Sequence, residues 1–265
     1  MGLFVHGHYL YNSAGREERT ISAVRIDMES HGGASGWDFF DKIYCISLIE
    51  RPDRRQDALA QFARVGLAER VEFVIVPRHP TDCEQGIYES HMRCMTQGLQ
   101  AGAEHILIFE DDIEFERFSP KILHNCVAFM RSNPDWHMFF WGCMVKGSRP
   151  TVNPSVVRIR YRSLTQSYAV NHRFARQLTQ HPWRGVAYDE FLNKLDDACT
   201  YAVYPSFAFQ SNSPSDNLRY LPLDRWRRML GGLRRLQKNN EFYHRYRKFI
   251  IAAHALALLL LLMAL

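Results

Sequence analysis

The sequence contains six cysteines but no C-x-x-C pair. Closely spaced cysteines are typical of zinc sites, and an even set in a short secreted chain is typical of a disulfide framework. Neither pattern is present, so neither kind of site is predicted. Cys45 and Cys199 are instead expected to pack as small hydrophobic residues.

Signals of the secretory pathway are also missing. Residues 1–40 contain no apolar run long enough for a signal peptide, and His6 stands where a myristoylation motif has Ser or Thr. Gly2 is therefore not a predicted lipidation site. No Asn-x-Ser/Thr acceptor remains once proline in the middle position is excluded. These absences favour a reducing, cytoplasmic location, and we expect residues 1–40 to form a flexible polar arm.

The rest of the chain is long enough for one catalytic domain. The 265 residues are 46% hydrophobic, which is sufficient for a full core, and residues 41–217 approach the usual size of a single domain. Expected strands lie at 71–76, 105–109, 138–141, 156–161 and 167–170, and expected helices at 89–102, 121–131 and 172–181. This alternation predicts an α/β fold with a mostly parallel, Rossmann-like sheet and flanking helices.

Three adjacent carboxylates follow the most apolar of these strands: Glu110, Asp111 and Asp112. Ligands of parallel sheets bind beyond the carboxyl ends of the strands. Carboxylates that repel one another at such a place are stabilised by a hard cation such as Mg²⁺ or Mn²⁺, which can bridge a phosphate. The triplet therefore predicts a metal site held by Glu110 and Asp112. The alternative is an ordinary acidic turn in which Asp112 caps a following helix.

Arginines follow the first strand of the domain. An apolar run over 42–49 leads into a helix opened by Pro52, with Arg51, Arg54 and Arg55 beside its first turn. Free amides at a helix N-terminus attract anions, and arginine adds positive charge. We expect Arg51 and Arg55 to contact a nucleotide and Arg54 to be solvated. The expected core stripe of this helix consists of Ala58, Leu59 and Phe62.

Five blocks resemble those of glycosyltransferase family 25, which includes bacterial lipooligosaccharide galactosyltransferases and collagen galactosyltransferases. They are I-S-L-x-x-R-x-x-R-R at 46–55, S-H at 90–91, L-I-F-E-D-D at 107–112, S-Y-A-V-N at 167–171, and a fifth block from Y-D at 188–189 to Y-P-S-F-A-F-Q and S-P-S-D at 204–216. One departure concerns the donor-side loop, because Gly86-Ile87-Tyr88-Glu89 precedes Ser90 where the family has Gly-Cys.

The resemblance implies a GT-A fold and an inverting, metal-dependent glycosyltransferase. Its donor would be a nucleotide sugar, expected to be a galactose-like UDP-sugar, and its acceptor a glycan or glycolipid. The residues implied in donor binding are Ser47, Leu48, Arg51, Arg55, His91, Asp111 and Gln210. Ser215 and Asp216 match the same final block as Gln210.

An acidic pair, Asp189 and Glu190, begins a later amphipathic helix with Phe191 and Leu195 expected inward. Inversion requires a carboxylate base that takes the proton of the acceptor hydroxyl. The resemblance places Asp189 at the acceptor side, so Asp189 is the predicted base and Glu190 the second candidate. The alternative is that Asp189 only caps the helix, where the dipole stabilises a carboxylate.

The C-terminal segment is first basic and then apolar. From Arg219 to Lys248 there are 10 Lys and Arg against 2 acids, whereas the remainder has 23 against 26. Because the excess is local, binding of nucleic acid is not expected. An apolar stripe among the arginines is typical of a helix lying on anionic lipid, and it consists of Trp226, Leu230, Leu233 and Leu236. The uncharged run 249–265 is at the short limit of a membrane span.

We therefore expect a catalytic domain at 41–217 and a membrane-associating tail at 218–265. Residues 219–265 would hold the protein at the cytoplasmic face of a membrane, as a peripheral or tail-anchored protein. The alternative is that the tail packs on the domain or on a partner. Two other functional classes stay open: a catalytically inactive glycan-binding or scaffold module, and a nucleotidyltransferase. The latter normally has a glycine-rich phosphate loop, and residues 47–55 contain no glycine.

Overall fold

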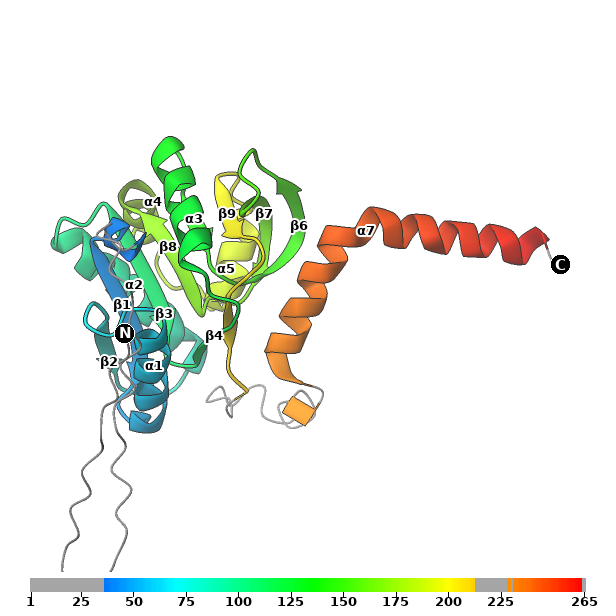
Figure 1. Ribbon diagram of the computed structural model, residues 1–265. Coiled ribbons are helices and arrows are strands. Elements are labelled where there is room, and N and C mark those ends of the chain that lie inside the picture. The colour runs from blue at the N-terminus through cyan, green and yellow to red at the C-terminus, as the bar shows by residue number, and fades with distance from the viewer. Residues whose placement is uncertain (1–35, 213–227, 230, 264–265) are drawn as a thin grey trace, which may run out of the picture. The chain divides into compact units, whose positions relative to one another are not determined.

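Two hydrophobic cores form on the two faces of a central sheet in the computed structural model, which describes residues 36–212, 228–229 and 231–263 (Figure 1). Some predictions of the sequence analysis lie wholly or largely outside these residues. They concern the arm of residues 1–40, Gly2, Ser215, Asp216, Trp226 and Leu230.

The large sheet consists of β1 (Lys42–Leu48), β2 (Glu72–Val76), β3 (His105–Glu110), β5 (Met138–Phe140), β6 (Met144–Pro150), β7 (Val156–Ser163), β8 (Ser167–Asn171) and β9 (Thr200–Val203). A second sheet pairs β4 (Ile113–Phe115) with β10 (Ala208–Gln210). The helices are η1 (Gly36–Phe39), α1 (Pro52–Arg64), α2 (Cys83–Gln100), α3 (Pro120–Ser132), α4 (His172–Leu178), α5 (Tyr188–Leu195) and α7 (Gly232–Met263).

Most strands of the large sheet run in the same direction, although several adjacent pairs of strands are antiparallel. The spatial order is β2-β1-β3-β8-β5-β9-β7-β6. β1 pairs in parallel with β2 and β3, and β5 with β9, whereas β8 and β7 are antiparallel to their neighbours. As a result β2, β1, β3, β5, β9 and β6 all run the same way. The predicted α/β class with a mostly parallel sheet is confirmed.

The central strands are buried on both faces, as their continuous apolar runs require. Successive side chains of a strand point to opposite sides of the sheet. In β3, Leu107 and Phe109 join the core beneath α1 and α3, while Ile106 and Ile108 join the core beneath α2, α4 and α5. This packing holds the end of β3, and therefore the acidic triplet, in a fixed position.

Several predicted elements are found with shifted boundaries. The helix expected to begin at residue 89 begins at Cys83, because the Asp82 side chain accepts hydrogen bonds from the amides of Glu84 and Gln85. The expected inward positions of Leu59 and Leu195 are wrong, since these side chains are 43% and 38% exposed. The short strands β4, β6, β9 and β10 were not predicted.

The domain begins before residue 41. Trp37, Phe39 and Phe40 are buried in the core beneath α1 and α3. The indole Nε1 of Trp37 donates a hydrogen bond to the carbonyl oxygen of Val65, at 2.8 Å. Burial of aromatic side chains contributes strongly to stability. The predicted arm of residues 1–40 therefore does not extend to residue 40.

The first turns of α7 are also part of the domain. Gln237 is completely buried, and its Nε2 donates to the carbonyl oxygen of Ala208, at 3.0 Å. Asn240 exchanges two hydrogen bonds with the backbone of Val145. The close packing of Gln237 and Ala208 requires glycine at position 142, because a Cβ there would lie 1.8 Å from the Ala208 oxygen.

Charges in the same part of α7 pair with the domain. Arg234 lies 3.0 Å from Glu114 and 2.8 Å from Glu116, and Lys238 lies 2.5 Å from Glu116. The predicted boundary at 217 and 218 is therefore wrong for these turns of α7, which pack on the domain. Some of the basic residues that were expected to contact lipid therefore form ion pairs within the protein.

The second half of α7 is different. From Phe249 to Met263 the residues are largely exposed. By length and composition, α7 is apolar enough to cross a membrane, with a mean hydropathy of 1.7 over an 18-residue window that is not buried. The apolar run predicted at 249–265 is thus helical and uncovered as far as residue 263.

Candidate active site

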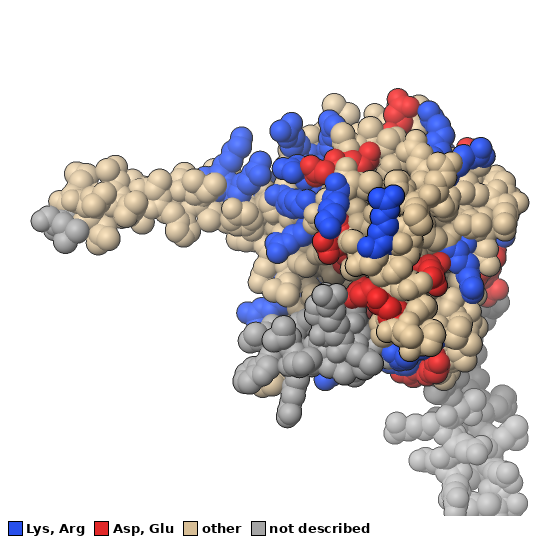
Figure 2. Space-filling model, turned by 180° about the vertical axis from the view of Figure 1, so that it is seen from behind, with Lys and Arg blue, Asp and Glu red and all other residues tan. Residues whose placement is uncertain are grey.

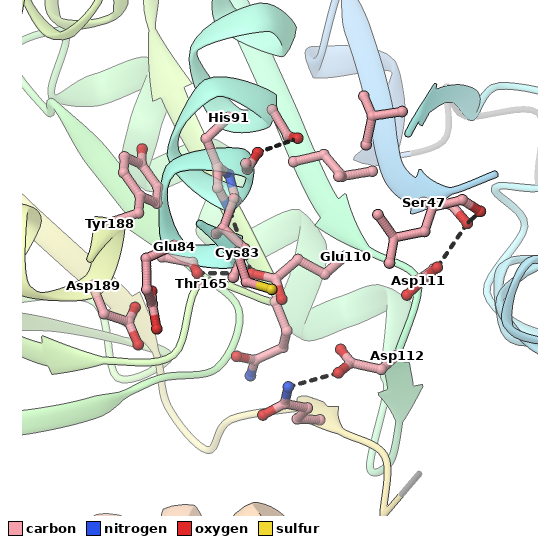
Figure 3. A pocket seen from close by; sticks show the side chains of 18 of the residues that line it. Ser47, Cys83, Glu84, His91, Glu110, Asp111, Asp112, Thr165, Tyr188 and Asp189 are labelled. Carbon is pink, nitrogen blue, oxygen red and sulfur yellow. Dashed lines mark hydrogen bonds and ion pairs between the residues drawn. The ribbon is translucent and has the colours of Figure 1, made fainter. Parts of the chain in front are cut away.

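A cavity of about 330 Å³ lies at the carboxyl ends of β1, β2 and β3 (Figure 3). Because these three strands are parallel, their ends meet at one edge of the sheet. The turn between β7 and β8, the first turn of α5, and residues of α1, α2 and β10 complete the wall. Leu233 in the first turn of α7 also lines it.

Asp111 is held by two neighbours. Its Oδ2 accepts a hydrogen bond from the Ser47 hydroxyl at 2.7 Å, and its Oδ1 lies 3.3 Å from the Arg54 guanidinium. Burial raises the pKa of Asp111, and the Ser47 and Arg54 contacts oppose that rise. Arg54 also lies 4.0 Å from Asp112, so one buried cation serves two carboxylates.

The two oxygens of the Asp112 carboxylate differ. Its Oδ2 accepts a hydrogen bond from Gln210 Nε2 at 2.6 Å, whereas its Oδ1 is buried and accepts none from the residues that the structure describes. Burial and the neighbouring charge of Glu110 raise the pKa of Asp112 to about 7. The helix-cap alternative does not apply, because β4 follows Asp112 and the next helix, α3, begins at Pro120.

Glu110 belongs to a buried chain of polar side chains. Its Oε1 accepts from the Thr165 hydroxyl at 2.7 Å and lies 3.5 Å from His91 Nε2. His91 Nδ1 lies 3.0 Å from the Tyr168 hydroxyl, which is 3.0 Å from the Tyr188 hydroxyl. Burial raises the pKa of Glu110, but His91 and Thr165 outweigh it, so the pKa is lowered. His91 is therefore placed to keep Glu110 ionised and oriented.

Asp189 faces the cavity from the side opposite Asp111 and Asp112, with Glu110 and Thr165 between them (Figure 3). It accepts hydrogen bonds from the Tyr161 hydroxyl and from the Leu164 amide, the latter at 3.1 Å to each oxygen. Burial raises the pKa of Asp189, although these donors oppose the shift. The N-cap of α5 is Ala187, so Asp189 is not its cap.

A divalent ion fits part of this arrangement. In the described ranges no group of three or more His, Cys, Asp or Glu side chains is arranged to hold a metal by itself. Glu110 and Asp112 nevertheless face one cavity, and the unpartnered Asp112 Oδ1 is a ready ligand atom. Mg²⁺ commonly takes only one or two protein carboxylates, with substrate phosphates and water as the other ligands. The residues present fit such an ion.

The structure brings most of the predicted site residues together. Those that line the cavity are Ser47, Leu48, His91, Glu110, Asp111, Asp112, Asp189 and Gln210. Arg51 instead pairs with Asp53 at 2.7 Å, and Glu190 pairs with Lys194 at 2.8 Å on an exposed face. Arg55 donates to Ser47 Oγ and to the carbonyl oxygens of residues 48 and 49, so it supports the loop behind the cavity.

The prediction that Arg54 is solvated is wrong. Arg54 is 9% exposed and lines the cavity. The buried residues of α1 are Arg54, Ala58 and Phe62, which follow one another at intervals of four. That helical spacing was visible in the sequence and indicated that Arg54 shares the inner face. Thr165 and Tyr188 were also not predicted, because their roles depend on contacts with distant strands and helices.

Arg54→Gln should lower the free energy of unfolding by about 3 kcal/mol, because it leaves two buried carboxylates without their cation. Arg51→Gln should have a smaller effect, since the Asp53 carboxylate that it pairs with is 61% exposed. Urea denaturation of the two variants measures the difference. Equal losses would show that Arg54 is not the structural cation of the site.

No family model matches this chain. It is 25% identical over 213 residues to procollagen galactosyltransferase 1 of Danio rerio, covering 68% of this chain and 34% of that protein. It is 26% identical over 190 residues to the inactive glycosyltransferase 25 family member 3 of Homo sapiens, covering 60% of this chain and 32% of that protein. The chain thus spans about a third of the length of these curated relatives.

Solved structures are similar to this chain at lower sequence identity. One is a glycosyltransferase involved in glycosylation of the major capsid of PBCV-1, with a TM-score of 0.37 and 13% identity over 61% of this chain and 81% of that chain. Another is A197 from STIV, with a TM-score of 0.40 and 9% identity over 64% of this chain and 85% of that chain. The two sequence relatives confirm the resemblance seen in the five blocks: the chain is similar to glycosyltransferase family 25.

Proposed function

We propose that this protein is a glycosyltransferase that moves a galactose-like sugar from a UDP-sugar to a glycan acceptor, with inversion at the anomeric carbon. The observation that carries the proposal is that a candidate metal ligand and a candidate base face each other across one cavity. Asp112, with an unpartnered oxygen, lies on one side, and Asp189 lies on the other (Figure 3). The sequence relatives, one of them a procollagen galactosyltransferase, support the same reaction class.

The donor side is built around the acidic triplet. Asp112 and Glu110 would hold Mn²⁺ or Mg²⁺, which when bound neutralises charge on a departing diphosphate. Arg54 keeps Asp111 in place and adds positive charge beside Asp112. The volume of about 330 Å³ lies within the range of small-molecule sites. Ser47, His91 and Gln210 orient the carboxylates of this side.

The acceptor side is built around Asp189. A general base must be deprotonated and within reach of the hydroxyl that it activates. Two donors fix the Asp189 carboxylate at the cavity wall, and burial moves its pKa upward, which makes it a stronger base than an exposed carboxylate. Attack from this side and departure toward Asp112 would be in line, as inversion requires.

The alternative is an inactive glycan-binding or scaffold module. It is favoured by the human relative, whose name describes it as inactive. Retention of Glu110, Asp112 and Asp189 in one cavity argues for activity, because an inactive module has no need of buried, repelling carboxylates.

Calorimetry with a panel of nucleoside diphosphate sugars, with and without Mn²⁺, tests this proposal. We expect binding of one UDP-sugar that depends on the metal, and slow hydrolysis or transfer of that sugar when an acceptor glycan is added. Asp112→Ala should fold and lose the metal-dependent binding. A wild-type chain that binds glycans but no nucleotide sugar would establish the inactive module instead.

We further propose that the protein acts at the cytoplasmic face of a membrane, with α7 as its attachment. Residues 249–263 supply an exposed apolar helix, and basic residues lie directly before it. The acceptor would then be a glycan precursor carried on lipid.

Truncation tests this attachment, and the packing of α7 sets where the cut must be made. A chain ending at Lys248 should stay folded and lose sedimentation with neutral phosphatidylcholine liposomes. A chain ending at Asn217 should also lose several kcal/mol of stability. It removes the buried Gln237, the two Asn240 hydrogen bonds and the ion pairs of Arg234 and Lys238 with the domain. If the chain ending at Lys248 still sediments, the apolar helix is not the attachment.

A further inference from the structure

A second cavity, of about 430 Å³, lies between the middle of α7 and the strands β6, β7 and β9. Its apolar wall includes Val145, Val157, Ile159 and Val203. Its cationic lining consists of Arg149 from β6 and Arg245, Arg247 and Lys248 from α7. We call this feature the basic groove. Among the described residues, it shares none with the candidate active site.

The cations of the basic groove are not neutralised within the described ranges. None of the ion pairs formed there includes Arg149, Arg245, Arg247 or Lys248. Arg245 lies 5.1 Å above the Tyr204 ring, which holds it without cancelling its charge. The groove therefore carries an excess of positive charge.

Among the described residues that line the groove, the acidic one is already engaged. Glu241 accepts a hydrogen bond from the Ser206 amide at 2.9 Å and lies 3.5 Å from Arg117. His244, also in the lining, has its pKa lowered by burial and by the charges of Arg247 and Arg162. The local field thus disfavours a further cation and favours an anionic ligand.

The position of the groove along α7 indicates where that anion comes from. Lys248 is the last charged residue of the helix, and Phe249, which follows it, is 75% exposed. Figure 2 shows Lys and Arg side chains gathered where the uncharged end of the chain adjoins the rest of the molecule. Basic residues at the end of a membrane-inserting helix lie at the level of the lipid headgroups.

We propose that the basic groove binds the phosphate of an anionic phospholipid headgroup. Arginine presents paired N–H donors that match phosphate oxygens, and the apolar wall can receive the adjoining glycerol and acyl carbons. Arg149 is distant in sequence from the other three cations, so the ligand site exists only in the folded protein. This proposal rests on the proposed membrane attachment and adds to it a defined lipid site.

The test uses the full chain and vesicles of phosphatidylcholine, alone or mixed with phosphatidylglycerol. The groove variant combines Arg149→Gln with Arg247→Gln, and the control combines Arg64→Gln with Arg93→Gln, two arginines that lie on α1 and α2 away from the groove. Each charge near an anionic surface is worth roughly fivefold in binding. We expect the groove variant to lose about 25-fold in preference for anionic vesicles, and the control to lose little.

A lysine pair, Arg149→Lys with Arg247→Lys, separates a lipid site from diffuse attraction, because it keeps the charge and removes the paired donors. A built site loses affinity with this variant, whereas wild-type preference for anionic vesicles would overturn the proposal. Equal losses in the groove and control variants would also overturn it.

Two further outcomes concern the ligand and the attachment. Competition by soluble glycerol phosphate as effective as competition by lipid would show that the groove takes a free phosphate compound and would overturn the lipid assignment. Equal binding to neutral and anionic vesicles would overturn the groove proposal and leave the apolar attachment standing. A chain that binds neither vesicle would overturn both. Melting temperature verifies that every variant is folded.

Discussion

Asp189→Asn should reduce sugar transfer by roughly 10²-fold or more without unfolding the protein, which is the usual scale for loss of a general base. Asparagine keeps an oxygen that can accept from Tyr161 and Leu164, so the turn before β8 should stay in place. It removes a buried charge whose pKa is raised by burial, so the variant should be at least as stable as the wild type above that pKa.

Turnover at saturating donor, together with calorimetry of donor binding, measures this effect. Donor binding should change little, because Asp189 lies across the cavity from Asp112 (Figure 3). Glu190→Gln is the matched comparison, since Glu190 is adjacent in sequence but exposed and paired with Lys194. A large loss of turnover in Glu190→Gln, with little loss in Asp189→Asn, would transfer the role of base to Glu190.

Asp112→Asn should raise the stability of the protein and abolish its metal-dependent binding of the donor. The folded pKa of Asp112 is about 7, whereas an unfolded aspartate titrates near 3.9. The folded protein therefore keeps a proton that the unfolded chain loses, and stability from this group is lost as pH rises from about 4 to about 7. Asparagine does not titrate, and it still accepts from Gln210.

The gain in the free energy of unfolding for Asp112→Asn should be near zero at pH 4. It should approach an upper limit of about 4 kcal/mol above pH 7. Urea denaturation at pH 4 and pH 8, with a chelator present, measures it. In a matched solution at pH 8 without the chelator, adding Mn²⁺ and UDP should stabilise the wild type and not the variant. Asp111→Asn is the matched control: burial raises the pKa of Asp111 too, but Ser47 and Arg54 oppose the rise, so the gain in stability at pH 8 should be smaller than for Asp112→Asn. Equal responses of the two variants would contradict the distinct roles assigned to the two carboxylates.

The metal assignment stays a prediction, but its chemistry follows from the packing. Asp111 has a hydroxyl and a guanidinium as partners, while Asp112 Oδ1 has none. A buried carboxylate oxygen without a donor is costly unless a ligand completes it. This difference between neighbouring residues of one triplet was invisible in the sequence, where all three acids looked alike.

Local pattern by itself determined where the candidate site lies. The apolar run before Glu110 has to form a buried strand, and a polar triplet at its end has to reach the edge of the sheet, because both follow from the period of a strand and the burial of its faces. The interval of four residues from Arg54 to Ala58 and Phe62 was equally local, but the prediction of a solvated Arg54 did not use it.

Tertiary structure alone decided which residues complete the site and how far the domain extends. Thr165 reaches Glu110, Asp189 takes its hydrogen bonds from Tyr161 and Leu164, and Gln237 reaches Ala208 through the space left by glycine at position 142. Each contact joins segments that are distant in sequence, so no local period records it. For the same reason the sequence indicated a separate C-terminal tail, whereas shape and hydrogen-bond complementarity make the first turns of α7 part of the domain and leave its uncharged turns exposed.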